Sequence, residues 1–320
     1  MTALWTRDAA AEATHGKIHG PDWSATGVTI DSRKIEAGDL FVALPGERVD
    51  GHDFVETALK AGAAAALVSR VPAGLEDAPL LVVDDVLGGL EDLARAARAR
   101  SGARIVAVTG SVGKTGTKEM LAACLSAHGR TVASVGNLNN HIGAPLSLAR
   151  LPQDCDYAVF ELGMNHADEI RPLTRMVAPH VAIITNVEPV HIEFFDGIDG
   201  IADAKAEILE GLEPGGAAVL NCDNASYERI RARARDLAVD RVVTYGQDAR
   251  CDVRGGAIEP GPNGTEVSAT VAGTETHWRV GGIGRLWGFN SLGVVAVLHA
   301  LKIEITPCLA ALSGVSAMRG

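Results

Sequence analysis

The sequence predicts an α/β fold: an N-terminal α/β block, residues 1–100, precedes a P-loop block with a mostly parallel sheet, residues 101–320. Three observations predict it. Short apolar runs alternate with amphipathic segments, which indicates a parallel sheet with helices on both faces. The runs are continuously apolar, as expected for strands covered on both sides. A glycine loop ending in Lys-Thr lies between one such strand and a helix.

The elements follow from the spacing of the apolar residues. In the first block we expect helices over 53–63 and 87–100 and strands over 64–69 and 80–83. Ser101-Gly102 reads as a hinge. In the second block we expect strands over 105–108, 131–135, 157–161, 181–185 and 217–220, and helices over 116–127, 169–177, 201–212 and 289–301. Residues 241–282 are rich in glycine and β-prone side chains and predict a small antiparallel insert.

Composition excludes several classes of protein. Among 320 residues, 47% are hydrophobic and the net charge is −11, which argues against a nucleic-acid partner because that needs a basic face. No leader peptide and no apolar run long enough for a membrane span are found. The five cysteines are odd in number and scattered, which favours reduced thiols over a disulfide framework or a zinc site. We expect a cytoplasmic monomer.

The glycine loop is the clearest chemical signal. A strand, a glycine turn and a helix that starts at Lys-Thr form an anion site, because backbone N–H groups and the helix dipole point at the phosphate. The spacing G-x-x-G-K-T is shorter than the usual phosphate loop, and a simple glycine turn is the alternative. We expect the loop to bind a nucleoside triphosphate through Gly110, Ser111, Val112, Gly113, Lys114 and Thr115.

Three further side chains lie at or beyond the ends of predicted strands, where ligands gather in an open α/β sheet. Glu161 ends one strand and is predicted to hold Mg²⁺ beside the triphosphate, the alternative being a solvated carboxylate. His191 follows another strand, although a lone histidine is more often structural. Lys205 lies on a predicted helix, and its spacing alone indicates a surface lysine.

Two polar clusters remain open between turn chemistry and ligand binding. Asn137, Asn139 and Asn140 follow the predicted strand 131–135, and their amides suit either a turn or a polar substrate. In the first block, Ser32 and Arg33 lie in an Asp-Ser-Arg-Lys run. Its local composition does not distinguish a turn from a ligand site.

Together these stretches resemble the Mur ligase family over nearly the whole chain, from about Asp31 onward. The Met-Asn-His run after Glu161 and the Asn-Leu-Asn-Asn run are similar to those of the member that adds D-Ala-D-Ala. The resemblance rests on the motifs Asp31-Ser-Arg, Gly38-Asp-Leu-Phe, Gly51-His-Asp-Phe, Gly-x-x-Gly-Lys-Thr, Gly136-Asn-Leu-Asn-Asn, Glu161-Leu-Gly-Met-Asn-His, Asn186-Val-x-x-x-His and Ala204-Lys-Ala-Glu-Ile.

The resemblance implies a chemistry. The family couples ATP hydrolysis to amide formation: a substrate carboxylate attacks the γ-phosphate, and the amine of the incoming component then attacks the acyl phosphate. For this chain it implies UDP-N-acetylmuramoyl-tripeptide and D-Ala-D-Ala as substrates, with ATP and Mg²⁺. Such a reaction needs positioning and charge neutralisation rather than a protein nucleophile.

The resemblance also implies residue roles. Lys114, Glu161, His191 and Lys205 would be catalytic, with Thr115 and Glu161 at one Mg²⁺ and His191 at the second. Lys205 would be carbamylated, which converts a cation into an anionic metal ligand. Asn290 would contact the adenine. Substrate contacts would come from Ser32, Arg33, Asn137, Asn139, Asn140 and His166.

Three departures from the family pattern stand out. Leu286 occupies a position where the family has histidine near the nucleotide, and Asp168 replaces a glycine, a change that we expect to be tolerated. The family also has a third, C-terminal domain of about 130 residues, a normal domain size. We expect that domain to be absent from residues 1–320, which would make this chain weakly active.

Two rival functions remain open. A sister ligase, including one that resembles folylpolyglutamate synthase, would share most of these motifs. A non-catalytic module that binds only a UDP-sugar or a nucleotide would keep the pockets without turnover.

Overall fold

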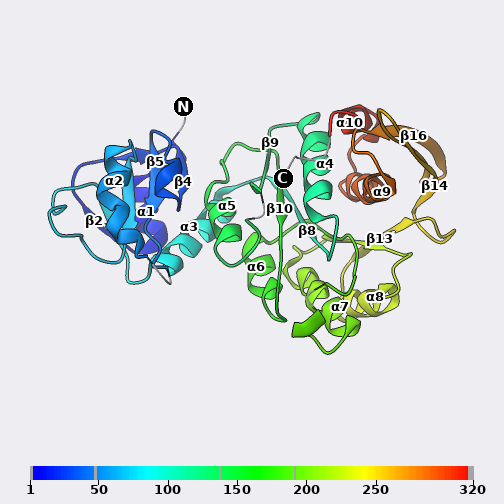
Figure 1. Cartoon of the computed structure of the whole chain (residues 1–320), viewed down its shortest axis with the longest axis horizontal. Coiled ribbons are helices and arrows are strands. Elements are labelled where there is room, and N and C mark those ends of the chain that lie inside the picture. The colour runs from blue at the N-terminus through cyan, green and yellow to red at the C-terminus, as the bar shows by residue number, and fades with distance from the viewer. Residues whose placement is uncertain (1–2, 47–48, 137, 191, 316–320) are drawn as a thin grey trace. The chain divides into compact units, whose positions relative to one another are not determined.

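The computed structural model describes residues 3–46, 49–136, 138–190 and 192–315, and the chain divides into two compact units. The first unit comprises Met1–Ser101 and Pro145–Gln153, and the second comprises Gly102–Ala144 and Asp154–Gly320. Their elements are labelled in Figure 1.

The first unit is built on a five-stranded sheet in the order β2-β7-β6-β5-β4, in which only the β2–β7 pair is antiparallel among the described residues. A short antiparallel pair, β1–β3, accompanies it. The strands are β1 (Trp5–Thr6), β2 (Lys17–His19), β3 (Ser24–Ala25), β4 (Gly27–Thr29), β5 (Asp39–Val42), β6 (Ala65–Val68) and β7 (Leu80–Val82). The helices are α1 (Arg7–Thr14), α2 (Val55–Lys60) and α3 (Val86–Arg100), with 3₁₀ turns η1 (Ser32–Lys34) and η2 (Gly51–Phe54).

Local sequence explains where these helices begin. The side chain of Thr6 accepts a hydrogen bond from the backbone N–H of Ala9 at the start of α1. Asp85 does the same for Gly88 at the start of α3, with a distance of 2.6 Å. Such caps satisfy the amides that a helix leaves without an internal partner. The apolar strands β5 and β6 are fully buried, as their continuous apolar sequence predicts.

The segment 145–153 belongs to the first unit although it is distant in sequence. The indole Nε1 of Trp5 donates to the carbonyl of Ala149 at 2.9 Å, and this bond is buried. Arg150 Nε donates to the carbonyl of Val28 on β4. Nothing in the local pattern of these residues predicts that they pack there.

The second unit contains a nine-stranded sheet, counted over the described residues, in the order β16-β15-β14-β13-β12-β11-β8-β10-β9. Its strands are β8 (Arg104–Thr109), β9 (Thr131–Ala133), β10 (Tyr157–Glu161), β11 (Val181–Ile184), β12 (Ala217–Asn221), β13 (Arg241–Gly246), β14 (Val253–Gly261), β15 (Gly264–Val271) and β16 (Thr274–Val280). Its helices are α4 (Lys114–Ser126), α5 (Gly143–Ala149, which runs on into the first unit), α6 (Ile170–Val177), α7 (Ile198–Ala206), α8 (Tyr227–Asp236), α9 (Arg285–Ala300) and α10 (Ile305–Leu312), with 3₁₀ turns η3 (Ile192–Phe194) and η4 (Glu207–Gly211).

Helices cover both faces of this sheet. Helices α4 and α9 contact one another and the strands on one side, while α6 and α8 contact the strands from the other (Figure 1). The strands β8, β10, β11 and β12 are almost entirely buried between these layers, whereas β9 at the edge of the sheet is half-buried. The α/β fold class with a mostly parallel sheet is therefore confirmed.

The antiparallel insert expected over 241–282 is partly corrected. Strands β14, β15 and β16 are antiparallel to one another, as predicted. However, β13 is parallel to β12, and β14 continues the same sheet by pairing in parallel with β13. Figure 1 shows β14 and β16 curving around α9. The helix fits there because Gly288 lacks a Cβ, which would lie 2.5 Å from Ile258 Cγ2.

Other boundaries also differ from the expectation. The helix predicted over 201–212 is α7 followed by the tighter turn η4, and α8 and α10 were not predicted. Over the part of the chain that the structure describes, none of the helices combines the length and the apolar character needed to cross a membrane.

Candidate functional site

The phosphate loop lies at the carboxyl end of β8, between β10 and β11 and next to the start of α4. Its glycines are required by geometry. Gly113 has φ +86°, and a Cβ there would lie 2.4 Å from Nδ2 of Asn290. A Cβ at Gly110 would lie 2.0 Å from Oγ1 of Thr185. Neither position accepts another residue without movement of its neighbours, so the loop has the close backbone approach of an anion site.

The loop is anchored to the end of β11 and the segment that follows it. The backbone N–H of Ser111 donates to the carbonyl of Asn186, and Ser111 Oγ donates to the carbonyl of Glu188. Thr185 Oγ1 donates to the carbonyl of Val112 at 2.6 Å. These bonds hold the loop open toward the cavity described below.

Lys114 opens α4 and folds back on the loop, where its Nζ donates to the carbonyl of Gly110 at 2.8 Å. Burial lowers its pKa from the ordinary value, and the nearby carboxylate of Glu161 opposes that shift. The ammonium therefore lies within the loop that would cradle a phosphate.

Glu161 is the polar centre of the site. It ends β10, is 2% exposed, and its two carboxylate oxygens have different partners. Thr115 Oγ1 donates to Oε2 at 2.9 Å, and Asn139 Nδ2 donates to Oε1 at 2.7 Å. A hydroxyl and a buried carboxylate side by side are oxygen ligands of the kind that Mg²⁺ prefers. The residues present fit a magnesium ion next to the phosphate loop.

A cavity of about 150 Å³ joins these groups. It brings together predicted residues from the phosphate loop, the amide cluster and the helix that carries Lys205. Its lining consists of Gly110, Ser111, Lys114, Asn139, Asn140, Gly163, Met164, Asn165, Glu169, Val190 and Lys205.

Lys205 corrects the expectation of a surface lysine. It is 5% exposed on α7 and faces the cavity that Lys114 also lines. Burial, together with the charge of Lys114, lowers its pKa to about 7. Helical spacing does not show this burial, because the polar residue Glu207 next to α7 is buried as well: it accepts the backbone N–H groups of Asp168 and Arg171.

The other predicted binding residues of the second unit differ in their distance from the cavity and in their burial. Asn140 lines the cavity and accepts the backbone N–H groups of Ile142 and Gly143, so it also serves as turn chemistry. Asn290 is buried on α9 against the phosphate loop. His166 is exposed, with its ring 4.7 Å from that of Phe194.

In the first unit, Ser32 and Arg33 lie on η1, where Arg33 pairs with Asp31 at 2.8 Å. Arg33 lowers the pKa of Asp31 to about 2. Asn137 and His191 lie outside the described residues.

Residue-by-residue reasoning missed several cavity residues, namely Met164, Asn165, Glu169 and Val190. Three of them lie in or just after the Met-Asn-His run. The position of this run after the end of a strand is the sequence signal that could have predicted their place in the cavity. The backbone N–H of Asn165 donates to Glu169 at 2.7 Å, which closes this loop on itself.

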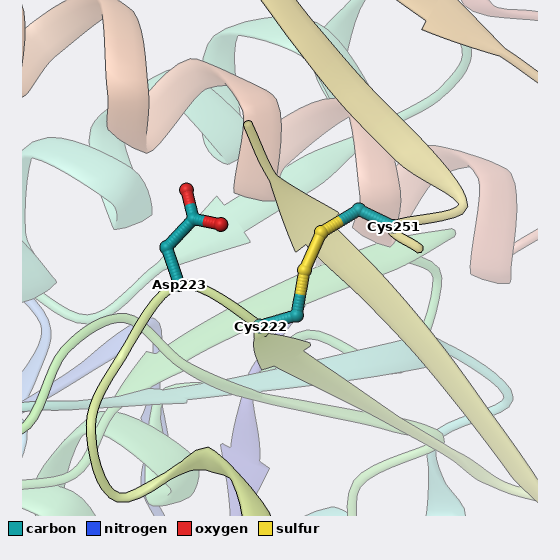
Figure 2. Close-up of side chains that lie close together, drawn as sticks. All are labelled: Cys222, Asp223 and Cys251. Atoms are coloured by element: carbon teal, nitrogen blue, oxygen red, sulfur yellow. A yellow bond between two sulfur atoms is a disulfide. The ribbon is translucent and has the colours of Figure 1, made fainter. Parts of the chain in front are cut away.

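The cysteine expectation was wrong for one pair. Cys222 follows β12 and Cys251 precedes β14, and the two are joined by a disulfide (Figure 2). Because β12 and β13 are parallel neighbours, the loops that leave them emerge at the same edge of the sheet. Their separation of 29 residues in sequence carries no such signal. Cys124, Cys155 and Cys308 are buried elsewhere.

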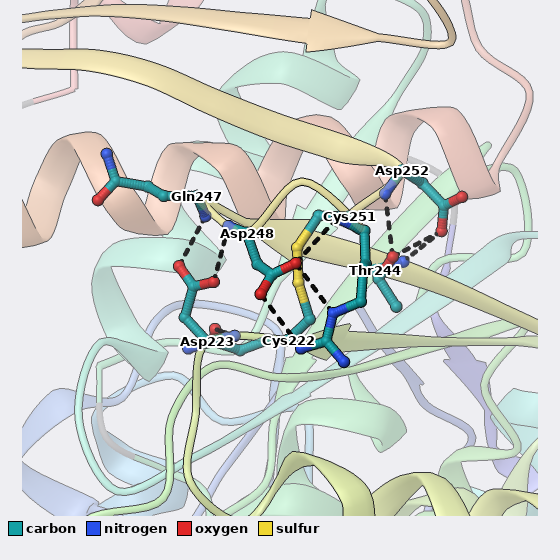
Figure 3. Close-up of a disulfide and its surroundings, with 9 residues drawn as sticks. Cys222, Asp223, Thr244, Gln247, Asp248, Cys251 and Asp252 are labelled. Carbon is teal, nitrogen blue, oxygen red and sulfur yellow. Dashed lines mark hydrogen bonds and ion pairs between the residues drawn. A yellow bond between two sulfur atoms is a disulfide. The ribbon is translucent and has the colours of Figure 1, made fainter.

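The surroundings of this disulfide are closed by hydrogen bonds. Asp223 lies near both sulfur atoms, and the three side chains form a group of metal-ligand types. Its carboxylate, however, accepts the backbone N–H groups of Gln247 and Asp248 at 2.6 and 3.0 Å (Figure 3). With the sulfurs bonded to each other and the carboxylate occupied, this cluster is a cross-link between two loops.

The fold and the site together define a P-loop α/β protein whose phosphate loop faces a buried carboxylate and a buried amine. More particularly, the chain belongs to the Mur ligase family. Residues 108–298 match the Mur ligase middle domain, and residues 24–98 match the domain described as "Mur ligase family, catalytic domain".

Relatives and solved structures agree. The chain is 46% identical over 213 residues to the UDP-N-acetylmuramoyl-tripeptide–D-alanyl-D-alanine ligase of Escherichia coli, covering 67% of this chain and 47% of that protein. It resembles the MurF structure from Acinetobacter baumannii with a TM-score of 0.87 and 33% identity, over 99% of this chain and 69% of that one. A MurF ligase from Thermotoga maritima, solved in complex with ADP, has a TM-score of 0.77 and 25% identity, over 92% and 67%. The chain spans about half the length of the curated relatives that it matches.

Proposed function

We propose that this chain forms the nucleotide- and substrate-binding part of an ATP-dependent ligase that joins D-Ala-D-Ala to UDP-N-acetylmuramoyl-tripeptide in peptidoglycan synthesis. The observation that carries the proposal is Glu161, which is hydrogen-bonded to Thr115 of the phosphate loop and to Asn139 of the amide cluster. It connects a nucleotide site with a second polar site in a chain similar to ligases of that name.

The nucleotide would occupy the phosphate loop. ATP supplies the phosphoryl group and Mg²⁺ neutralises its charge. Lys114 and the amides at the start of α4 would hold the β- and γ-phosphates, because those amides have no partner inside the helix. Thr115 and Glu161 would hold the magnesium ion. Asn290, packed against Gly113, would lie toward the base.

Lys205 would act as a carbamate. An amine whose pKa is about 7 is largely neutral at slightly alkaline pH, and only the neutral amine reacts with CO₂. The reaction forms an N–C bond and releases one proton, leaving a carboxylate opposite Lys114. That anion would join His191 in holding a second metal ion. A ¹³C-bicarbonate NMR signal that disappears in Lys205→Met would support this role, and its absence in the unaltered chain would exclude it.

The amide cluster would hold the peptide-bearing substrate. Asn139 and Asn140 line the cavity, and we assign Asn137 and His166 to the same substrate. Ser32 and Arg33, with the first unit around them, would bind the UDP end. Each ligation would transfer the γ-phosphoryl group to the substrate carboxylate with loss of ADP. The amine of D-Ala-D-Ala would then displace phosphate from the acyl carbon.

Phosphate release tests the proposal. With Mg²⁺-ATP and UDP-N-acetylmuramoyl-tripeptide, we expect release that depends on D-Ala-D-Ala in a protein of the relatives' full length, and slow release from residues 1–320 alone. The reason is that rapid turnover needs a further part of the protein to close over the nucleotide site, because closure assembles the catalytic groups and excludes water from them. Rapid ligation by residues 1–320 would contradict the second expectation.

Binding measurements distinguish the two rival functions from the proposed ligase. A sister ligase would prefer UDP-N-acetylmuramoyl-dipeptide, or another acid, over the tripeptide in competition titrations. A non-catalytic module that keeps only the UDP-sugar pocket would show no Mg²⁺-dependent ATP binding and no effect of Lys114→Ala, whereas one that binds a nucleotide would bind ATP without turnover. We also propose a cytoplasmic monomer, which light scattering and cell fractionation test.

A further inference from the structure

Lys118 is an unusual residue in α4. Its side chain is 0% exposed, yet it carries an ammonium group. It lies one turn after Thr115, so both residues occupy the same side of the helix. Lysine is almost never fully buried without partners, because removing a charge from water costs several kcal/mol unless hydrogen bonds replace the water.

The ammonium of Lys118 is fully satisfied. Its Nζ donates to the carbonyl of Ser134 at 2.7 Å and to that of Gly136 at 3.0 Å. It also lies 3.0 Å from Oε1 of Glu119. An ammonium has three N–H donors, and these are three acceptors. Two of them are backbone atoms of one short segment, just after β9.

That segment forms one side of the site. Ser134 Oγ accepts the backbone N–H of Glu161 at 3.0 Å. Farther along, Asn139 donates to the Glu161 carboxylate and its carbonyl accepts the N–H of Gly163 at 2.8 Å. The segment therefore runs from the partners of Lys118 to the amides at the cavity.

We propose that Lys118 is a positioning residue that holds residues 134–136, and through them Asn139 and Asn140, at a fixed place relative to the phosphate-loop helix. It thereby sets the affinity for the substrate that the amides contact, a consequence that rests on the proposed function. Thr115 and Lys118 share α4, so the two halves of the site are tied to one rigid element.

Packing alone does not account for this lysine. An apolar side chain of similar length would fill the same volume without the cost of burying a charge. What an apolar residue cannot do is bind two carbonyls of a segment that otherwise lacks regular structure. Lys118→Met is therefore the informative change, and Glu119→Gln is its matched control, because glutamine keeps an acceptor at the third position.

Hydrogen exchange tests the positioning directly. In Lys118→Met we expect exchange to rise at least tenfold at the amides of Leu138, Gly143 and Gly163, while the α4 amides of Leu121 and Leu125 stay unchanged. Glu119→Gln should behave like the unaltered chain. Unchanged exchange at the first three amides would overturn the proposal, whatever substrate the protein uses.

Titration tests the functional consequence. We expect Lys118→Met to weaken UDP-N-acetylmuramoyl-tripeptide binding at least tenfold and Mg²⁺-AMP-PNP binding less than threefold. Equal losses of both affinities would mean a merely structural role. If the unaltered chain does not bind the tripeptide, the proposed function fails, and hydrogen exchange still decides the role of Lys118.

A second pair of variants covers the case in which Lys118→Met does not fold. Gly136 has φ +58°, and a Cβ there would meet nothing within 4 Å. Gly136→Asn tolerates this conformation, whereas Gly136→Val strains it and shifts the carbonyl that Lys118 binds. We expect Gly136→Val to reproduce the split in affinities and Gly136→Asn to bind both ligands normally. Normal binding by both variants would count against the proposal.

Discussion

At the residue scale, the site depends on backbone positions that only glycine fills. Gly113 has a positive φ and lies directly against Asn290, so any side chain there meets both strain and a clash. Asp168 also has a positive φ, +67°, a conformation that glycine adopts most readily. Aspartate is among the residues that tolerate this conformation.

Gly113→Ala should abolish most nucleotide binding. We expect Mg²⁺-AMP-PNP affinity to fall more than tenfold, because the new Cβ would lie 2.4 Å from Asn290 Nδ2 and the loop must move. The matched control is Gly215→Ala, which has φ +77° and open space around its Cβ. Gly215→Ala should cost about 1–2 kcal/mol of stability through backbone strain alone, and Gly113→Ala should cost more because the clash adds to the strain. Only Gly113→Ala should alter the titration.

Lys205 should make stability depend on pH. Its pKa is about 7 when folded, against 10.5 for an ordinary lysine. Between these values the unfolded chain binds the proton more often, so stability rises with pH by up to about 1.4 kcal/mol per unit. The loss of stability caused by burying the charged ammonium of Lys205 is complete below pH 7 and disappears toward pH 10.5.

Urea unfolding of the unaltered chain and of Lys205→Met, at pH 7.5 and 9.0 in CO₂-free buffer, measures this effect. Other groups titrate in both proteins and cancel in the difference. We expect the unaltered chain to gain about 2 kcal/mol relative to the variant over this interval. A difference that does not change with pH would show that folding does not lower the pKa of Lys205.

At the scale of elements, the start of α6 depends on a residue from another element. The two carboxylate oxygens of Glu207, on η4, accept the backbone N–H groups of Asp168 and Arg171 at 2.7 and 3.0 Å. The residue before α6, Glu169, makes no cap of its own with its side chain. Glu207 therefore does for α6 what Thr6 and Asp85 do locally for α1 and α3.

Glu207→Gln should destabilise the second unit by about 1–2 kcal/mol, because the amide keeps only one acceptor and leaves one partly buried backbone N–H unpaired. Chemical denaturation followed by the far-ultraviolet circular dichroism signal measures the change. Glu228→Gln, at an exposed position on α8, should have no effect. Equal stability of the two variants would show that water replaces the lost acceptor.

At the scale of the whole molecule, the first unit recruits a segment from far along the chain. The buried bond from Trp5 to Ala149 joins residues 144 positions apart. The guanidinium of Arg100 covers the Trp5 ring, with 3.8 Å to its centroid. Residues 145–153 are therefore part of the packing of the first unit.

Trp5→Phe should lower the stability of the first unit by about 1–2 kcal/mol, since it leaves the Ala149 carbonyl without its donor. Trp23→Phe is a strict control, because Trp23 Nε1 is buried and finds no partner among the residues that the structure describes. In thermal unfolding, the Trp5→Phe variant should have a lower Tm than the Trp23→Phe variant. The reverse order would mean that the indole bond contributes nothing.

Several features could be predicted from sequence because they are local. The phosphate loop, the strand before it and the helix after it occupy consecutive residues, and each contributes its own signal. The strands β10, which ends at Glu161, and β11, which ends at Ile184 one residue before the expected end, were recognised for the same reason. The two-stage helix over 198–211 and the parallel strand β13 were missed because spacing alone does not show which neighbours a segment meets.

The sequence by itself determined the fold class, the family resemblance and the anion site, since apolar periodicity and glycine conformation act within a few residues of the chain. Tertiary structure alone decided that Lys205 and Lys118 are buried, that Glu161 contacts both Thr115 and Asn139, and that Cys222 meets Cys251. Burial and long-range contact depend on which segments close against one another, and that arrangement is set by the packing of the whole core.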